Sequence, residues 1–382
     1  MSTPKSFWET VILACLAVTG FISVFIAKDM TATLILMVLA YFSNASYSMV
    51  SRSAVRDSIL YHAFTTLLSN LVFYMVLKQL VTDNMTLALF IPYTVATVYG
   101  SFTGAKASQR VEEYFGITTD MSKKERTPQS ILAQKLLLGF LTVLGIIVGI
   151  YSDNMMTTLV VASLAFGDNV TFSLLRRSRN TSNTTYHIFA SIVKSLAWYL
   201  LFQSLSLRGM PFALFIPYSF GSVLGGIAGQ EVSAWIEKKI GATADAHLST
   251  NLSWYKLVSW KPIIILMCIM IPIVLLSEQR TFLAFLAVLS AAQQVSFSIV
   301  SRSRQRNNMT YHIIASIFSN SIWFLTFREL QVKKWTNELF IPYAVGGAVG
   351  SVTGVGFSMG IEKAIGASSD SHVKQVPVAN KS

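Results

Sequence analysis

The chain has 382 residues, of which 53% are hydrophobic and only 13% are charged, and its mean hydropathy is +0.54. A soluble domain carries roughly twice that charged fraction, so the composition excludes a soluble globular protein and indicates an integral membrane protein. The net charge of +12 does not require nucleic acid as a partner, because basic residues accumulate in the cytoplasmic segments of membrane proteins.

Apolar runs of about 20 residues, long enough to cross a bilayer, recur along the chain. They predict helices at about 8–27, 30–50, 58–79 and 86–114, then at 132–151, 155–175, 184–205 and 211–239, and finally at 258–276, 281–301, 309–330 and 336–364. The first run lacks a small-residue cleavage site, so we expect a retained helix rather than a signal peptide. The expected fold is therefore all-α, with about twelve transmembrane helices.

The peptide FIPY occurs three times, with its proline at Pro92, Pro217 and Pro342, each 125 residues from the next. This spacing predicts three tandem four-helix repeats at 1–125, 126–250 and 251–367, followed by a cytoplasmic tail at 368–382. Because four is an even number, we expect the repeats to share one orientation, with a pseudo-threefold axis along the membrane normal.

The basic residues predict the orientation of these helices. With the N-terminus inside, cytoplasmic segments and helix ends hold 22 of the 30 Lys and Arg residues, outer segments hold seven, and Lys194 falls inside a span. This bias predicts that both termini lie in the cytoplasm, in a plasma membrane or bacterial inner membrane. The same charges would attract anionic membrane lipids as partners.

The fourth helix of each repeat carries a small residue at every fourth position and then a glutamate and a glycine. In the first repeat these are Ala96, Gly100, Gly104, Ser108, Glu112 and Gly116. Such a ridge favours close packing of two helices, and the last glycine suits a helix C-cap. Alternatively, the bare ridges line a path for a solute.

Each second helix ends with an arginine, and each third helix begins with a Tyr-His pair. The positions are Arg52, Arg177 and Arg302, and His62, His187 and His312. Arranged about an axis, these residues would form a cytoplasmic mouth that attracts a carboxylate or phosphate. Alternatively, the arginines form structural ion pairs with Glu112, Glu237 and Glu362, and the histidines make interfacial hydrogen bonds rather than transfer protons.

The second repeat differs from the others within the membrane. Asp168 replaces Ser43 and Gln293, and Lys194 replaces Ser69 and Ser319. The two helices form a hairpin that places both charges at similar depth, so we expect them to form an ion pair, with a structural or a gating role. The polar residues that accompany them at this level are Asn44, Asn70, Asn169, Ser195, Gln294 and Asn320. This band is the candidate solute site.

Several kinds of functional motif are missing from the sequence. We find no phosphate-binding GxxxxGK[ST], no Cys/His cluster with metal-ligand spacing, and no Gly-x-Ser-x-Gly nucleophile turn. We therefore predict no cofactor, no metal and no catalytic residue.

In each repeat one helix ends with a small residue and an arginine, and basic residues and an aromatic-rich helix follow. The last helix has a Tyr-x-x-Gly-x-x-x-Gly pattern and ends in Glu and Gly. In the third repeat this last helix reads IPYAVGGAVGSVTGVGFSMGIEKAIGA. About 75 of each 125 residues thus resemble a membrane domain of uncharacterised bacterial proteins near the YitT-type family. The resemblance implies a fold more than a function. The chain differs in tripling the unit and in lacking the small ferredoxin-like domain of those proteins.

These observations favour a transporter or channel for a small polar, anionic solute that passes near the pseudo-threefold axis. One alternative is a non-transporting scaffold or exclusion protein that binds lipid or a partner protein. A weaker alternative is a membrane-embedded enzyme acting on a lipid headgroup. We expect a monomer with internal threefold symmetry and no nucleic-acid partner.

Overall fold

The structure, a computed structural model, describes residues 4–53, 59–115, 154–178, 184–241, 260–303 and 308–366, together with five single positions between 136 and 147. The described residues form helices joined by short turns, and no strand occurs among them. Seven stretches of this described part are long and apolar enough to cross a membrane. The prediction of an all-α, multi-pass membrane protein is therefore confirmed. Most of the helix expected at 132–151, and the tail at 368–382, lie outside the described residues.

Equivalent helices begin at intervals close to 125 residues. The second helices are α2 (Met30–Ser53), α6 (Met155–Ser178) and α11 (Arg280–Ser303), and the third helices are α3 (Ile59–Thr82), α7 (Thr184–Ser206) and α12 (Met309–Val332). The fourth helices are α4 (Phe90–Phe115), α8 (Phe215–Ile240) and α13 (Phe340–Ile365), each preceded by a 3-10 turn, namely η1 (Leu87–Leu89), η2 (Phe212–Leu214) and η3 (Asn337–Leu339). The first helices are α1 (Pro4–Ile26) and α10 (Trp260–Leu276).

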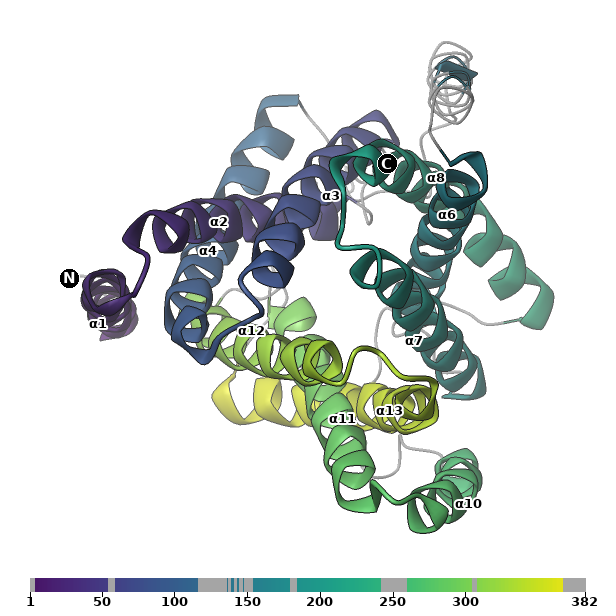
Figure 1. Ribbon diagram of the computed structural model, residues 1–382. Helices are drawn as coiled ribbons and strands as arrows, with labels where there is room; N and C mark the ends of the chain where they lie inside the picture. Colours follow the sequence, from purple (N-terminus) through teal and green to yellow (C-terminus); the bar gives the residue numbers. More distant parts are fainter. Residues whose placement is uncertain are drawn as a thin grey trace, which may run out of the picture.

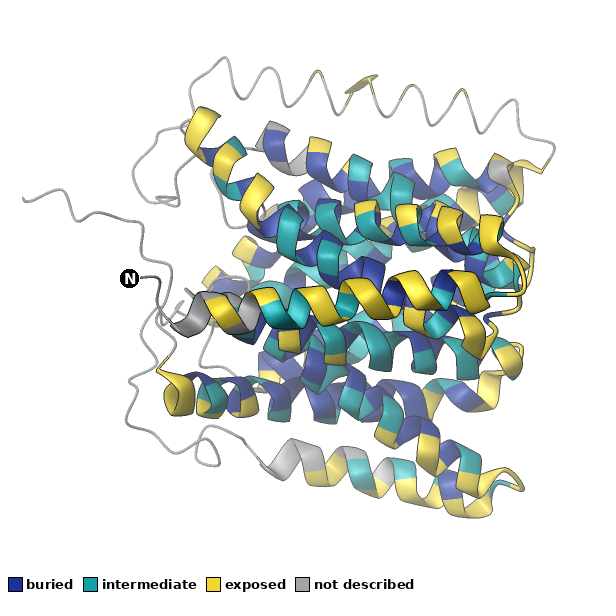
Figure 2. Ribbon diagram, turned by 90° about the vertical axis from the view of Figure 1, so that its left-hand side faces the viewer, coloured by how far each residue is buried: buried dark blue, intermediate teal, exposed yellow. Residues whose placement is uncertain are grey.

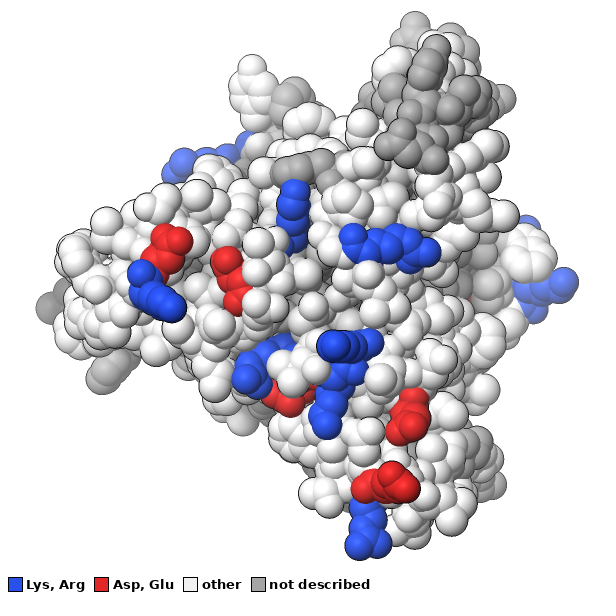
Figure 3. Space-filling view, viewed as in Figure 1, with Lys and Arg blue, Asp and Glu red and all other residues white. Residues whose placement is uncertain are grey.

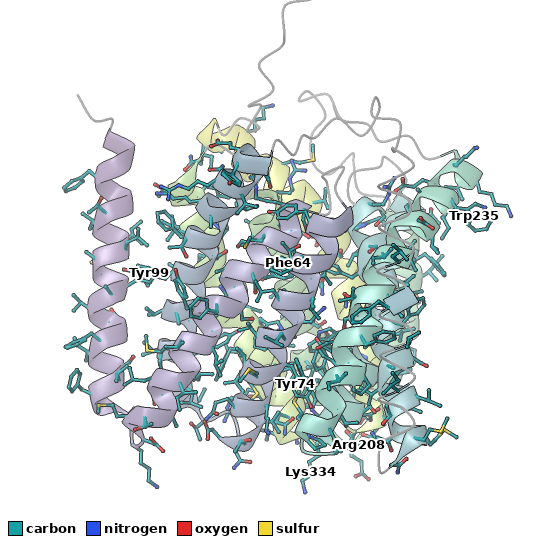
Figure 4. All side chains as sticks on the ribbon, turned by 90° about the horizontal axis from the view of Figure 1, so that it is seen from above. Phe64, Tyr74, Tyr99, Arg208, Trp235 and Lys334 are labelled. Atoms are coloured by element: carbon teal, nitrogen blue, oxygen red, sulfur yellow. The ribbon has the colours of Figure 1, made fainter. Side chains whose placement is uncertain are left out.

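The helices run side by side along their length (Figure 4), and α3, α7 and α12 lie around the middle of the bundle, with α1 and α10 at its periphery (Figure 1). Each third helix packs on the fourth helix of another repeat: α3 contacts α8, α7 contacts α13, and α12 contacts α4. Arg208 and Lys334 lie at one end of the bundle and Trp235 near the other (Figure 4). The end with Arg208 and Lys334 carries scattered charges of both signs (Figure 3).

The burial pattern is that of a protein surrounded by lipid. On α1, which shows its exposed face in Figure 2, Phe21, Phe25 and Ile26 expose 66%, 65% and 78% of their surface. In contrast, the serines Ser101 and Ser108 are completely buried. A soluble protein would bury the large apolar side chains and expose most of the serines.

The glycine ridges pack against neighbouring helices. A Cβ atom at Gly100 would lie 2.0 Å from the carbonyl oxygen of Tyr41, and one at Gly350 would lie 2.1 Å from that of Ala291. Only glycine permits such backbone contact between helices. Close packing, rather than a solute path along the ridge, is therefore confirmed. The expected C-cap is also present at Gly366, which has a φ of +62°.

Candidate solute-binding cavity

A cavity of about 230 Å³ lies between the second, third and fourth helices of all three repeats. The residues of the expected polar band all line it. They are Asn44, Asn70, Asp168, Asn169, Lys194, Ser195, Gln294 and Asn320. The cavity thus brings together residues from six helices, namely α2, α3, α6, α7, α11 and α12. This agrees with the prediction that these residues lie at the same depth in the membrane. The cavity is smaller than the roughly 300–1,000 Å³ of drug-sized ligand pockets, and so suits a small solute.

The predicted pair between Asp168 and Lys194 is present. The Nζ of Lys194 on α7 donates a hydrogen bond to Oδ1 of Asp168 on α6, and the two side chains are 13% and 11% exposed. The ammonium also lies 5.4 Å from the ring centroid of Phe172, within range of a cation–π interaction. An unpaired charge at this depth would be costly, so the two substitutions that distinguish the second repeat compensate each other.

Other polar atoms around the pair lack protein partners. The Oε1 of Gln293, the Nδ2 of Asn70 and the Oγ1 of Thr66 are buried without a hydrogen bond, and all three residues line the cavity. The Nδ2 of Asn169 instead donates to the carbonyl oxygen of Ala165 at 3.1 Å, which leaves its amide oxygen for the cavity. Buried polar groups are nearly always hydrogen-bonded. The cavity therefore presents hydrogen-bond donors and acceptors suited to a polar solute.

Three aromatic rings line the cavity on the side of the polar band towards the C-terminal ends of α2, α6 and α11, the side expected to face the cytoplasm. Tyr47, Phe172 and Phe297 occupy equivalent positions in α2, α6 and α11. Their centroids form a nearly equilateral triangle, with separations of 6.4 Å from Tyr47 to Phe172, 6.3 Å from Tyr47 to Phe297, and 6.3 Å from Phe172 to Phe297. At these distances the rings are in contact. We call these three residues the inner aromatic triangle.

A second group of aromatic rings lies on the opposite side of the polar band, and four of its five members line the cavity. Phe73, Trp198 and Trp323 are again equivalent residues, and Phe202 and Phe327 join them. Phe73 lies 5.9 Å from Trp323 and 6.0 Å from Phe202, and Trp198 lies 4.7 Å from Phe202. Phe327 lies 5.2 Å from Trp323. We call these five residues the outer aromatic layer.

The tyrosines of the FIPY peptides line the cavity beside this layer. Tyr343 stacks on Trp198, with centroids 5.4 Å apart, and Tyr93 stacks on Trp323 at 5.6 Å. In both cases the tyrosine and the tryptophan come from different repeats. Neither the tyrosines nor the two aromatic groups were identified from the sequence, although aromatic residues recurring at the 125-residue interval were a signal for them.

The arginine at the end of each second helix forms an ion pair with the glutamate of the fourth helix in the same repeat. Arg52 donates from Nε and Nη2 to Glu112 at 3.1 and 2.8 Å, and Arg302 donates to Glu362 at 2.9 and 2.7 Å. The third pair, Arg177 with Glu237, is also formed. The structural ion pairs are thus present. None of the three arginines is among the residues found to line the cavity, whereas Arg176, which was not singled out from the sequence, is.

The two histidines whose side chains the structure describes lie between repeats. His187 of α7 hydrogen-bonds through Nδ1 to Ser178 at 2.8 Å and through Nε2 to Ser351 of α13 at 3.1 Å. His312 of α12 bonds in the same way to Ser303 and, on α4, to Ser101. Both are buried, so they do not form the exposed mouth considered above. The side chain of His62 lies outside the described residues.

Comparison with known proteins identifies no relative of this chain. No protein-family model matches the chain, and neither a curated protein nor a solved structure matches it. Among the described residues, no group of three or more His, Cys, Asp and Glu side chains could hold a metal ion.

Proposed function

We propose that this protein is a membrane transporter for a small polar solute that carries an anionic group, and that the solute occupies the cavity. The observation that carries the proposal is the polar cavity itself, which contains an ion pair and unpartnered amide groups inside a bundle of apolar helices. Polar and charged groups are costly inside a membrane and commonly mark substrate pathways.

The charges around the cavity support a solute with an anionic group. The described lining residues include one carboxylate, Asp168, and two bases, Lys194 and Arg176. Asp168 and Lys194 offset each other, and Arg176 adds a second base to the lining. Arg176 lies one helical turn beyond Phe172 and donates to the carbonyl oxygen of Val50 at 3.4 Å. It is thus suited to attract an anion at the inner end of the cavity.

The arrangement of the repeats supports a path through the middle of the bundle. Equivalent residues of the three repeats meet in the inner aromatic triangle, and the repeats make the same contacts with one another between third and fourth helices. We propose that the three repeats surround a pseudo-threefold axis along the membrane normal, with both termini in the cytoplasm. The inner aromatic triangle and the outer aromatic layer would then be gates on either side of the solute.

The aromatic contacts at both ends of the cavity also favour a second candidate function. A scaffold or exclusion protein that transports nothing would have a middle closed by packed side chains, as these layers are. The two functions differ in whether the layers ever open. Flux measurements distinguish them directly.

The test uses the purified protein in liposomes, with swelling followed by stopped-flow light scattering after mixing with lactate, glycine or glycerol. We expect at least one of the charged solutes to enter well above the rate of protein-free liposomes. The double variant Asp168→Asn, Lys194→Gln removes both charges of the pair together and should reduce this entry at least tenfold. Arg177→Ala, outside the cavity lining, serves as the control. Equal entry into liposomes with and without the protein would refute transport of these solutes.

A further inference from the structure

We propose that the solute is a zwitterion with an ammonium and a carboxylate, as in a small amino acid, and that it binds by taking over the partners of the Asp168–Lys194 pair. This inference rests on the proposed function and narrows it from any solute with an anionic group to one that carries both charges. The pair would open, so that Asp168 holds the ammonium and Lys194 holds the carboxylate.

At the level of the pair, the charged group and the unpartnered amide atom are acceptors on one side of the cavity and donors on the other. The second helices provide acceptors: the carboxylate of Asp168, the unpartnered Oε1 of Gln293 and the amide oxygen of Asn169. The third helices provide donors: the ammonium of Lys194 and the unpartnered Nδ2 of Asn70. An ammonium requires acceptors and a carboxylate requires donors. One solute with both groups satisfies both sides at once.

Charge balance distinguishes this solute from a simple ion. A solute that carries only a carboxylate would bind Lys194 and leave Asp168 buried without its partner, whereas a cation would leave Lys194 alone. Removing one member of a buried ion pair is strongly destabilising, because the other charge remains uncompensated. A zwitterion gives each member a new partner of the correct sign. It is therefore the class of ion that can enter without leaving a buried charge unpaired.

The neighbouring repeats limit the site to a single solute in one orientation. The positions equivalent to Asp168 are Ser43 and Gln293, and those equivalent to Lys194 are Ser69 and Ser319. The shared cavity thus contains one carboxylate and one ammonium at this level. Arg176 lies eight residues from Asp168, about 12 Å along the helix, and is too distant to act at the same level. The volume of about 230 Å³ also limits the solute to a small molecule.

The binding test uses the full-length protein in lipid nanodiscs and follows intrinsic fluorescence, because Trp198 and Trp323 line the cavity. The probes are L-alanine, N-acetyl-L-alanine and L-alaninamide, which carry both charges, only the negative charge and only the positive charge. We expect L-alanine to bind at least tenfold more tightly than either analogue. Equal binding of N-acetyl-L-alanine, or no binding of L-alanine, would overturn the inference.

Variants of the pair should change the preferred charge. Asp168→Asn leaves Lys194 without its carboxylate and should shift the preference at least tenfold towards N-acetyl-L-alanine, and Lys194→Gln should shift it equally towards L-alaninamide. Lys333→Gln, which removes a lysine that does not line the cavity, retains the pair and should leave alanine binding within about threefold. The double variant, which lacks both charges of the pair, should bind none of the probes selectively. Unchanged preference in both folded single variants would refute the exchange of partners.

Entry into liposomes separates this inference from the proposed function. Binding of L-alanine without entry would refute transport while supporting the zwitterion site. Entry of N-acetyl-L-alanine as fast as L-alanine would support transport and refute the zwitterion. Binding and entry of L-alanine alone would support both.

Discussion

The substitution Gly350→Ala tests the close packing of α13 on α11. The new Cβ would lie 2.1 Å from the carbonyl oxygen of Ala291, against an ordinary contact of at least 3.4 Å, so the helices would have to separate by about 1.3 Å. Overpacking of this kind costs about 1–3 kcal/mol, or more where backbone must move. The same helix offers a matched control, because a Cβ at Gly360 meets nothing within 4 Å. There, alanine should stabilise by about 1 kcal/mol through its helix propensity.

The two variants should therefore differ by about 2–4 kcal/mol in opposite directions. The measurement is the apparent midpoint of unfolding in a mild detergent, followed by circular dichroism and by the loss of the monodisperse peak in size-exclusion chromatography. Gly360→Ala should unfold at or above the wild-type temperature and Gly350→Ala clearly below it. Equal midpoints would refute the conclusion that the glycine ridge is required by backbone contact.

Three further outcomes are expected. Arg52→Ala should lower stability by about 3–5 kcal/mol, because the buried carboxylate of Glu112 loses its arginine. Arg177→Ala should cost less, because the side chain of Arg177 is 37% exposed. Unfolding midpoints that rank the two variants in the reverse order would contradict this. Phe172→Ala removes one ring of the inner aromatic triangle and should raise the passive leak of glycerol into liposomes. A leak no greater than that of the wild-type protein would show that other side chains close the cavity. His312→Phe retains an aromatic ring but loses the hydrogen bonds to Ser101 and Ser303. It should therefore lower the free energy of unfolding by about 1–3 kcal/mol. An unchanged unfolding midpoint would argue against a role of these hydrogen bonds in joining the repeats.

The helices could be predicted closely because hydrophobic length is a strong signal in a membrane protein. The helix expected at 30–50 is observed as Met30–Ser53, and that expected at 309–330 as Met309–Val332. The fourth helices begin a few residues later than expected, after a 3-10 turn. Pro342, for example, lies in the first turn of α13, where its missing N–H is tolerated.

The candidate site could be predicted where one repeat differs from the others. Asp168 and Lys194 appear together in the second repeat, and this joint change indicated the ion pair that the structure contains. The aromatic layers could not be found by polarity, because Phe172 or Trp323 would be equally suited to face lipid or the interior of a membrane protein. The partner of His187 could not be found either, because Ser351 belongs to another repeat and their contact depends on how the repeats pack.

The contacts between third and fourth helices have a consequence for the history of the chain. Because α12 of the last repeat returns to α4 of the first, every repeat has two neighbours and none is terminal, unlike an open array, whose end units need special caps. Three separate copies of one unit could close such a ring equally well. In that homotrimer, however, any substitution would appear three times, and three aspartates and three lysines would crowd into the same 230 Å³. Joining the units in one chain is what permits a single Asp168–Lys194 pair in the shared cavity.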